Sequence, residues 1–436
     1  MQKTKHLELF IHHEQQGQYL TLPFQMPKNV EEFRLSYHYP FNNEGETAVQ
    51  NGKFTAIRKV NIIDLGVIGP DGKQVGASGA DKNAFFIKAN QATPGYTPQA
   101  LIPGEWKILI GAYKVASEGV KVVYDLVFTF MERRLLIGDI HTHTLASDGV
   151  LTVEELAIHA QRHGLDFLAI TDHNQMVSAE RLGHIAGITL IPGVEWTHYQ
   201  GHSNFLGVDQ PYDAPFFTKT EADVRSRFES ARERGALIII NHPCDPSCGF
   251  HFDLEKLPFD ALEIWNGPMR ESNLQAVALW QSMLEAGKRI PAVGGSDYHR
   301  DELFQILGGP CMGVYALSDS PADILEALKA GHSFIRFAPR GPDILLRVGE
   351  AIMGDCVEWQ EDLAIVISAV SLKKDDVIRL ISDKETLNVF QTPEDGEVTL
   401  EFPVKSPGFA RVEIYRHFLP GLPPLPALIS NPIYFI

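Results

Sequence analysis

Downstream of Arg134 the chain alternates short apolar runs with helical segments, and this alternation limits the fold more than any other feature. The run LTVEELAIHAQRHG offers Thr152 as a helix N-cap, Glu155 three residues later and Gly164 beyond the last turn. The apolar run LDFLAI follows at once, and similar runs recur as ITLIPGVEW, ALIIINHP, ALEIWNG and IPAVGGSD. Repeated strand–helix units predict a parallel sheet, and about 200 residues are enough to close such a sheet into a barrel.

The two flanking segments have a different pattern. Residues 1–134 contain short alternating runs separated by clusters such as GPDGK, which is typical of a β-sandwich. Residues 339–436 return to strand-like runs such as LAIVISAV. We therefore expect an α/β fold in three parts: an N-terminal β-sandwich-like domain at residues 1–134, a barrel at residues 135–338 and a C-terminal β module at residues 339–436.

Composition and charge exclude several classes of protein. No apolar run reaches the about 20 residues that span a bilayer, and the N-terminus lacks the apolar core of a secretion signal, so we expect a cytoplasmic protein without a membrane partner. The formal net charge of -17 repels phosphate backbones, which disfavours bulk nucleic acid and favours a small-molecule partner. Four cysteines are too few for a disulfide framework in a chain of this size.

Imidazole and carboxylate groups follow the ends of several expected strands. His141 and His143 stand one residue apart after the run LLIG, so a strand projects both rings to one face. The same position is taken by Asp172, His173, Glu195, His242, Asp297 and His299. Imidazole with carboxylate is a ligand set for Zn²⁺, Mn²⁺ or Fe²⁺, and so many donors indicate two or three divalent ions with Glu195 placed to bridge. This arrangement indicates metal-assisted hydrolysis.

Five ordered motifs, HTH…SDG, ITDHN, GVEW, NHP and GGSDYH, resemble those of the PHP superfamily, named for polymerase and histidinol phosphatase. The resemblance covers Leu135 to Arg336 and implies a distorted (β/α)7 barrel with a di- or trinuclear metal centre. The stretch GVEWTHYQGHSNFLG and the flanking β modules are most similar to the carbaryl-hydrolase-like (CehA/McbA) branch.

The resemblance also implies how the ligands are shared. A first ion would be held by His141, His143, Glu195 and Asp297, and a second by Asp148 and His173 with Glu195 bridging. A third would be held by His242, His299 and one more histidine. We favour His202 over His198 for that last ligand, because His202 begins the next strand-like run.

The expected function is hydrolysis of a small phosphate ester by a metal-bound hydroxide. His202 or His242 would protonate the leaving group when not itself a ligand, and Arg270 and Arg300 would bind the anionic group. Hydrolysis of a carbamate or carboxylic ester on the same centre is the alternative. A weaker alternative is an inactive metal-binding or ligand-binding protein. The acidic charge disfavours a polymerase-associated exonuclease.

Other residues of the middle region are not expected to belong to the ligand set of the metal centre. Asp172 is expected outside the ligand set, as a hydrogen-bonding group that fixes its neighbours. His159 and His163 imitate a zinc pair on a helix, but we expect them to be solvated. Cys244 and Cys248 with His251 form a disfavoured alternative, a structural zinc site in HPCDPSCGFH.

Overall fold

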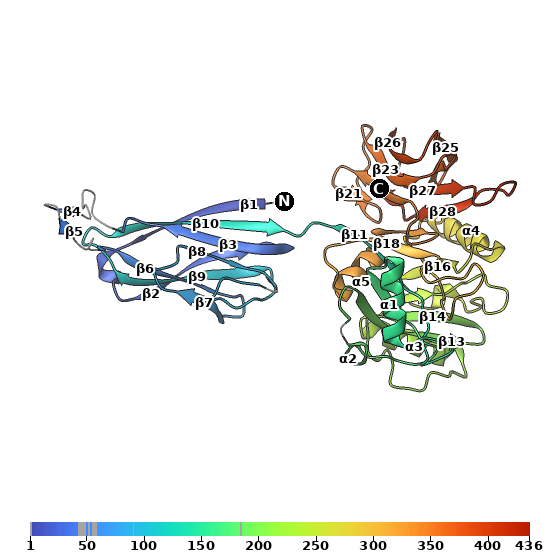
Figure 1. Ribbon diagram of the computed structural model, residues 1–436, viewed down its shortest axis with the longest axis horizontal. Helices are drawn as coiled ribbons and strands as arrows, with labels where there is room; N and C mark the ends of the chain where they lie inside the picture. Colours follow the sequence, from blue (N-terminus) through green and yellow to red (C-terminus); the bar gives the residue numbers. More distant parts are fainter. Residues whose placement is uncertain (1, 42–48, 51–52, 55–58, 90, 184) are drawn as a thin grey trace. The chain divides into compact units, whose positions relative to one another are not determined.

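The computed structural model describes residues 2–41, 49–50, 53–54, 59–89, 91–183 and 185–436 (Figure 1). The chain divides into two compact units, Met1–Glu132 and Arg133–Ile436. The expected boundary near residue 338, between the barrel and the C-terminal β module, lies inside this second unit. This boundary stays a prediction. Among the described residues, no helix combines the length and apolar content that crossing a membrane requires.

The first unit contains two four-stranded antiparallel sheets that share an apolar core. Trp106 and Phe33 are fully buried in it, and the rings of Phe33 and Phe128 stack at 5.5 Å. Buried and more exposed residues alternate along β10, as the two-residue period of a strand requires. The first sheet contains, in spatial order, β1 (Gln2–Ile11), β10 (Val120–Phe130), β3 (Val30–His38) and β8 (Ala84–Ile87). The second contains β2 (Tyr19–Met26), β9 (Gly104–Lys114), β6 (Ile62–Ile68) and β7 (Gln74–Ser78). The short strands β4 (Val49–Gln50) and β5 (Lys53–Phe54) pair with each other.

The second unit is a mixed α/β fold built on one long sheet. Its first nine strands carry the histidine-rich motifs, in the order β17 (Ala292–Gly295), β16 (Ala261–Asn266), β15 (Leu237–Ile240), β14 (Gly201–Leu206), β13 (Thr189–His198), β12 (Phe167–Ile170), β11 (Arg134–Asp139), β18 (Cys311–Ala316) and β19 (Ser333–Arg336). The helices are α1 (Val153–His163), α2 (Ala179–Leu182), α3 (Glu221–Glu233), α4 (Glu271–Glu285) and α5 (Pro321–Ala330).

Helix α1 begins and ends where the sequence predicts. Thr152 Oγ1 accepts a hydrogen bond from Glu155 N at 3.2 Å, and Thr152 N donates to the Glu155 carboxylate at 2.9 Å. Gly164 has φ +83°, a left-handed conformation that glycine adopts without strain. The capping box and the glycine C-cap are therefore both present.

The sheet is parallel only in part. Strands β11, β12 and β13 pair in parallel, as do β15, β16 and β17, but β14 is antiparallel to both of its neighbours. Only Tyr199 and Gln200 separate β13 from β14. A parallel connection needs about a dozen residues or more, so this short link can form only a hairpin.

The C-terminal strands extend the same sheet and add a second layer. Strand β19 pairs with β28 (Leu425–Ser430), and the sheet continues through β27 (Gly408–Arg416), β24 (Val377–Ser382) and β25 (Thr386–Gln391). A four-stranded sheet of β21 (Ala351–Ile352), β20 (Asp343–Val348), β23 (Ala364–Leu372) and β26 (Gly396–Pro403) shares an apolar core with it. The remaining short strands, β22 (Cys356–Val357) and β29 (Ile433–Phe435), pair with each other.

Candidate metal centre

The first two histidines lie just beyond the end of β11, held by a buried aspartate. Asp139 accepts hydrogen bonds from His141 N at 3.2 Å and Ser296 N at 3.1 Å, so one carboxylate joins the exits of β11 and β17. Burial raises the Asp139 pKa to about 6. The rings of His141 and His143 lie side by side, 5.3 Å apart.

Four side chains form what we call the inner group: His141, His143, Glu195 and Asp297. His141 Nε2 lies 3.4 Å from both Glu195 Oε1 and Asp297 Oδ1. His143 Nε2 lies 3.0 Å from Asp297 Oδ1 and 3.4 Å from Glu195 Oε2. The donor atoms come from the ends of β11, β13 and β17 and converge on one point, as the resemblance implied for the first ion.

A second cluster adds Asp148, His173 and His299 to His143, and we call these three added residues the outer group. His299 Nε2 lies 3.1 Å from Asp148 Oδ1, and His173 Nε2 lies 3.7 Å from Asp148 Oδ2. The loop can bring Asp148 over His143 because Gly149 touches the His143 carbonyl, where a Cβ would come within 2.4 Å of the oxygen. The structure thus groups His299 with Asp148, whereas the sequence expectation grouped it with His242.

A third cluster contains His202, His242 and Cys248. His202 Nδ1 lies 3.0 Å and His242 Nε2 lies 3.5 Å from Glu195 Oε1. In the β13–β14 hairpin Thr197 pairs with His202, which puts His202 on the face of Glu195. His198 lies on the other face, stacked on Trp196 at 5.4 Å.

Glu263 is a functional candidate that sequence reasoning missed. Its Oε1 lies 2.9 Å from His141 Nδ1, and its Oε2 accepts a hydrogen bond from His242 N at 2.9 Å. Glu263 is buried on β16, within the run ALEIWNG. A charged residue in an otherwise apolar strand was the available signal, because such a residue is buried only with partners.

Backbone strain is concentrated at the same strand ends. His242 has φ +28° and Asp297 has φ +51°, values that non-glycine residues rarely adopt. A Cβ on Gly295 would lie 2.5 Å from His141 Cβ, so the close approach of β17 to the exit of β11 requires glycine. The fold therefore maintains an unfavourable backbone where the ligand atoms meet.

The electrostatics of the inner group depend on opposite charges at very short range. Burial lowers the pKa of His141, but the carboxylates of Glu263, Asp297 and Glu195 outweigh burial and hold that pKa well above its usual value. Burial raises the pKa of Glu195, yet the adjacent imidazoles, His141 foremost, bring it well below its usual value. The carboxylates therefore favour the protonated form of His141, whereas burial lowers the pKa of His143 below its usual value.

The donor set fits divalent cations. In the described part of the chain, the buried ring nitrogens His141 Nε2 and His143 Nδ1 make no hydrogen bond. Buried polar atoms normally have a partner, because leaving one unpaired is costly. A divalent ion would supply that partner, and nitrogen and oxygen donors suit Zn²⁺, Mn²⁺ and Fe²⁺.

The other residues singled out by sequence occupy distinct places. Asp172 accepts hydrogen bonds from Thr144 N and Ser147 Oγ, both at 2.7 Å, and so fixes the loop that carries Asp148. His159 pairs with Asp301, and the rings of His159 and His163 are 4.5 Å apart on α1, outside the three clusters.

The two candidate arginines differ in their connection to the centre. Arg270 Nη2 donates to Asn266 Oδ1 at 3.3 Å, and Asn266 Nδ2 donates to Asp297 Oδ2 at 3.3 Å. Arg300 instead lies 3.6 Å from the exposed carboxylate of Glu302. Arg270 is thus linked to the inner group through one side chain.

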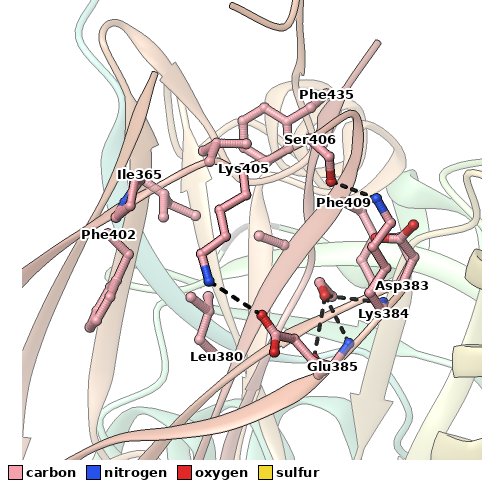
Figure 2. Close-up of a pocket in the computed structure, with 14 residues that line it drawn as sticks. Ile365, Leu380, Asp383, Lys384, Glu385, Phe402, Lys405, Ser406, Phe409 and Phe435 are labelled. Carbon is pink, nitrogen blue, oxygen red and sulfur yellow. Dashed lines mark hydrogen bonds and ion pairs between the residues drawn. The ribbon is translucent and has the colours of Figure 1, made fainter. Parts of the chain in front are cut away.

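A separate cavity of about 340 Å³ lies among the C-terminal strands (Figure 2). Leu380, Phe402 and Phe409 line it, and Lys405 and Glu385 form an ion pair at 3.8 Å beside it. Its lining includes none of the metal-centre residues. We assign it no part in the chemistry.

The segment that carries most of these motifs matches a known protein-domain family. Residues 139–279 match the PHP domain. The superfamily expected from the motifs is confirmed for this segment, and the carbaryl-hydrolase-like branch stays a prediction.

Curated relatives match short segments of the chain. The chain is 36% identical over 88 residues to the 5'-3' exoribonuclease Rnm of Salmonella typhimurium, which is 18% of this chain and 30% of that protein. It is 33% identical over 67 residues to the phosphoribosyl 1,2-cyclic phosphate 1,2-diphosphodiesterase of Eggerthella lenta, 15% of this chain and 26% of that protein. The chain thus spans less than a third of each relative. Both relatives are enzymes by name, which agrees with the expectation of an enzyme.

Among solved structures, a two-domain protein from Bacteroides vulgatus containing a predicted PHP-like metal-dependent phosphoesterase is similar. The similarity has a TM-score of 0.41 at 21% identity and covers 68% of this chain and 95% of that one.

Proposed function

We propose that the PHP domain is a metal-dependent phosphoesterase acting on a small anionic phosphate ester. One observation carries this proposal: five imidazoles lie within 3.5 Å of the Glu195 carboxylate, those of His141, His143, His173, His202 and His242. Such a carboxylate can bridge several cations, and a group of cations suits the charge of a phosphate ester.

The residues present would hold two or three ions of Zn²⁺, Mn²⁺ or Fe²⁺. The inner group would hold one and the outer group, with His143, another; His202 and His242 offer donors for a third. Bound ions of this kind supply a nucleophile by lowering the pKa of water, and they stabilise charge on the phosphoryl oxygens.

The protein's own residues orient the substrate and the ligands. Arg270 is half exposed beside the inner group, where its guanidinium can bind a phosphate oxygen. Asp172 holds the Asp148 loop, and Glu263 holds the ring of His141. His202 and His242 face Glu195, and either imidazole can deliver a proton to the leaving group only while it binds no ion.

The names of the two curated relatives, an exoribonuclease and a diphosphodiesterase, support phosphoester chemistry. We also propose that strands β11 to β19 correspond to the distorted (β/α)7 barrel that the motifs imply. The acidic charge of the chain favours a small substrate over long nucleic acid.

A carbamate or carboxylic ester hydrolase is the second candidate, and a specific feature favours it. Exposed apolar side chains lie close in sequence to the outer group: Leu145 precedes Asp148 in its loop, and Leu303 and Phe304 follow His299. The side chain of Gln305 ties this second loop to the centre, since its Nε2 donates to the Asp297 backbone carbonyl at 3.0 Å. An apolar rim suits an aryl ester, as the resemblance to the carbaryl-hydrolase-like branch also suggests.

The test is hydrolysis of 4-nitrophenyl phosphate, 4-nitrophenyl acetate and an aryl carbamate by Mn²⁺-reconstituted protein, beside His141→Ala and the matched control His159→Ala. We expect phosphate hydrolysis that disappears in His141→Ala and survives in His159→Ala. Metal-loaded protein that cleaves only the carbamate or acetate would replace this proposal with the second candidate. Retained metal without turnover of any substrate would favour a binding protein.

A further inference from the structure

Cys248 lies against the metal centre, and Cys244 does not. Cys248 Sγ is 3.6 Å from His242 Nδ1, and its sulfur belongs to a cluster whose donor atoms, with those of His202 and His242, all lie within 4.8 Å of one another. Cys244 instead packs against the apolar core. The disfavoured alternative of a zinc site at Cys244, Cys248 and His251 is therefore not the combination of donors that the structure brings together.

The loop from His242 to Phe250 is constructed so that it returns Cys248 to His242. Asp245 N donates to His242 O at 3.0 Å, and Gly249 N donates to Asp245 O at 2.9 Å. The turn is tight, because a Cβ on Gly249 would lie 2.5 Å from Asp245 O. The Asp245 carboxylate accepts hydrogen bonds from Ser247 N at 2.9 Å and Cys248 N at 3.3 Å.

We propose that Cys248 is a metal ligand, which gives the position at His202 and His242 a sulfur donor. Two ligands of one tetrahedral zinc, at about 2.0 Å for nitrogen and about 2.3 Å for sulfur, stand about 3.5 Å apart. The observed separation of Cys248 Sγ and His242 Nδ1, 3.6 Å, has this value. On binding, the thiol proton leaves to solvent and the sulfur forms the bond to the ion.

This assignment distinguishes the third position chemically from the other two. The inner and outer groups offer only nitrogen and oxygen, which accept Mn²⁺, Fe²⁺ or Zn²⁺. A thiolate with two imidazoles prefers Zn²⁺ over Mn²⁺. The inference rests on the proposed metal centre, and it implies that His202 and His242 are ligands rather than proton donors when zinc is present.

The first test is spectroscopic and needs no substrate. Full-length protein is stripped with a chelator and reloaded with Co²⁺, as wild type, Cys248→Ser and the matched control Cys244→Ser. We expect a near-ultraviolet thiolate-to-Co²⁺ charge-transfer band in the wild type and in Cys244→Ser that is absent from Cys248→Ser. We also expect zinc affinity at one position to fall about tenfold or more in Cys248→Ser. An unchanged band in Cys248→Ser, or no band in the wild type, would overturn the assignment.

A second measurement avoids mutation, in case a variant fails to fold. Iodoacetamide alkylation of the wild type is followed by mass spectrometry, with and without Zn²⁺, and the exposed Cys356 serves as the reference thiol. Zinc should slow modification of Cys248 at least about tenfold relative to Cys356. Equal rates with and without zinc contradict the proposal. Because neither readout involves turnover, an inactive protein that shows the band refutes only the phosphoesterase function.

Discussion

The inner and outer groups are built from the same kinds of side chain but differ in how far the fold encloses them. The side chains of His141, His143 and Glu195 are at most 1% exposed, whereas Asp148 is 56% exposed. The inner ligands lie on β13 or just beyond the ends of β11 and β17, and Glu263 fixes the ring of His141 from behind. Asp148 instead lies on a loop that Asp172 holds.

This difference suggests two kinds of metal position. Buried donors in fixed orientations lose little entropy on binding, so the inner ion should be held tightly. Water competes for an exposed carboxylate, so the outer ion should exchange and face the substrate. The same protein can then keep one ion as part of its structure and recruit another for the reaction.

Glu195→Gln should disrupt the inner and outer metal positions together, because Glu195 contacts donors of all three clusters. Glutamine preserves the volume but removes the charge that bridges cations. We expect kcat/KM to fall by about 10³-fold or more and the bound metal, measured by mass spectrometry, to fall with it. Added metal should not restore the rate; restoration would show that Glu195 does not bridge.

Asp148→Asn should weaken only the outer position. We expect activity at limiting metal to fall by about 100-fold, with one ion retained per chain. Excess Mn²⁺ should recover most of the rate, since His173 and His299 remain. The comparison fails if the variant loses both ions together.

Glu263→Gln tests whether support from behind makes the inner position tight. Glutamine can still bond to His141 but no longer favours its charged or metal-bound form, so inner-site affinity should fall by about 10- to 100-fold. Competition with a chromogenic chelator measures this affinity. An unchanged value would show that burial alone accounts for the tight position.

Much of this centre follows from the sequence, because strand ends in a sheet of this type share one edge. That rule placed His141, His173 and Asp297 beyond the ends of β11, β12 and β17, whereas Glu195 lies within β13, three residues before its end. The sharing of ligands did not follow, because His299 meets Asp148 only through a turn at Gly149 that no periodicity reveals. Glu263 was missed for a related reason, since its importance depends on which face of β16 meets the centre.

The pH dependence of the metal-free protein should report the inner group. The lowered pKa values of Glu195 and Asp297 stabilise the fold above about pH 4, and this contribution disappears as the pH falls through the folded values. The raised pKa of His141 contributes fully below about pH 6.5 and is lost as the pH rises. We therefore expect Tm in chelator to be highest between about pH 4.5 and 6.5. Metal should remove the alkaline decline, and a flat profile in chelator would contradict this account.

The smallest effect should come from the arginines, and it tests whether the substrate approaches beside the inner group. Arg270 is linked to Asp297 through Asn266, whereas Arg300 pairs with Glu302 in solvent. Arg270→Ala should raise KM for a phosphate ester by about tenfold, as expected for a charged hydrogen bond, and Arg300→Ala should change it less than about twofold. Metal content should stay the same in both variants, which separates substrate binding from damage to the centre. If neither variant alters KM, the proposal of an anionic substrate loses its main support. The exposed apolar side chains of Leu145, Leu303 and Phe304 would then favour a carbamate or carboxylic ester as the substrate.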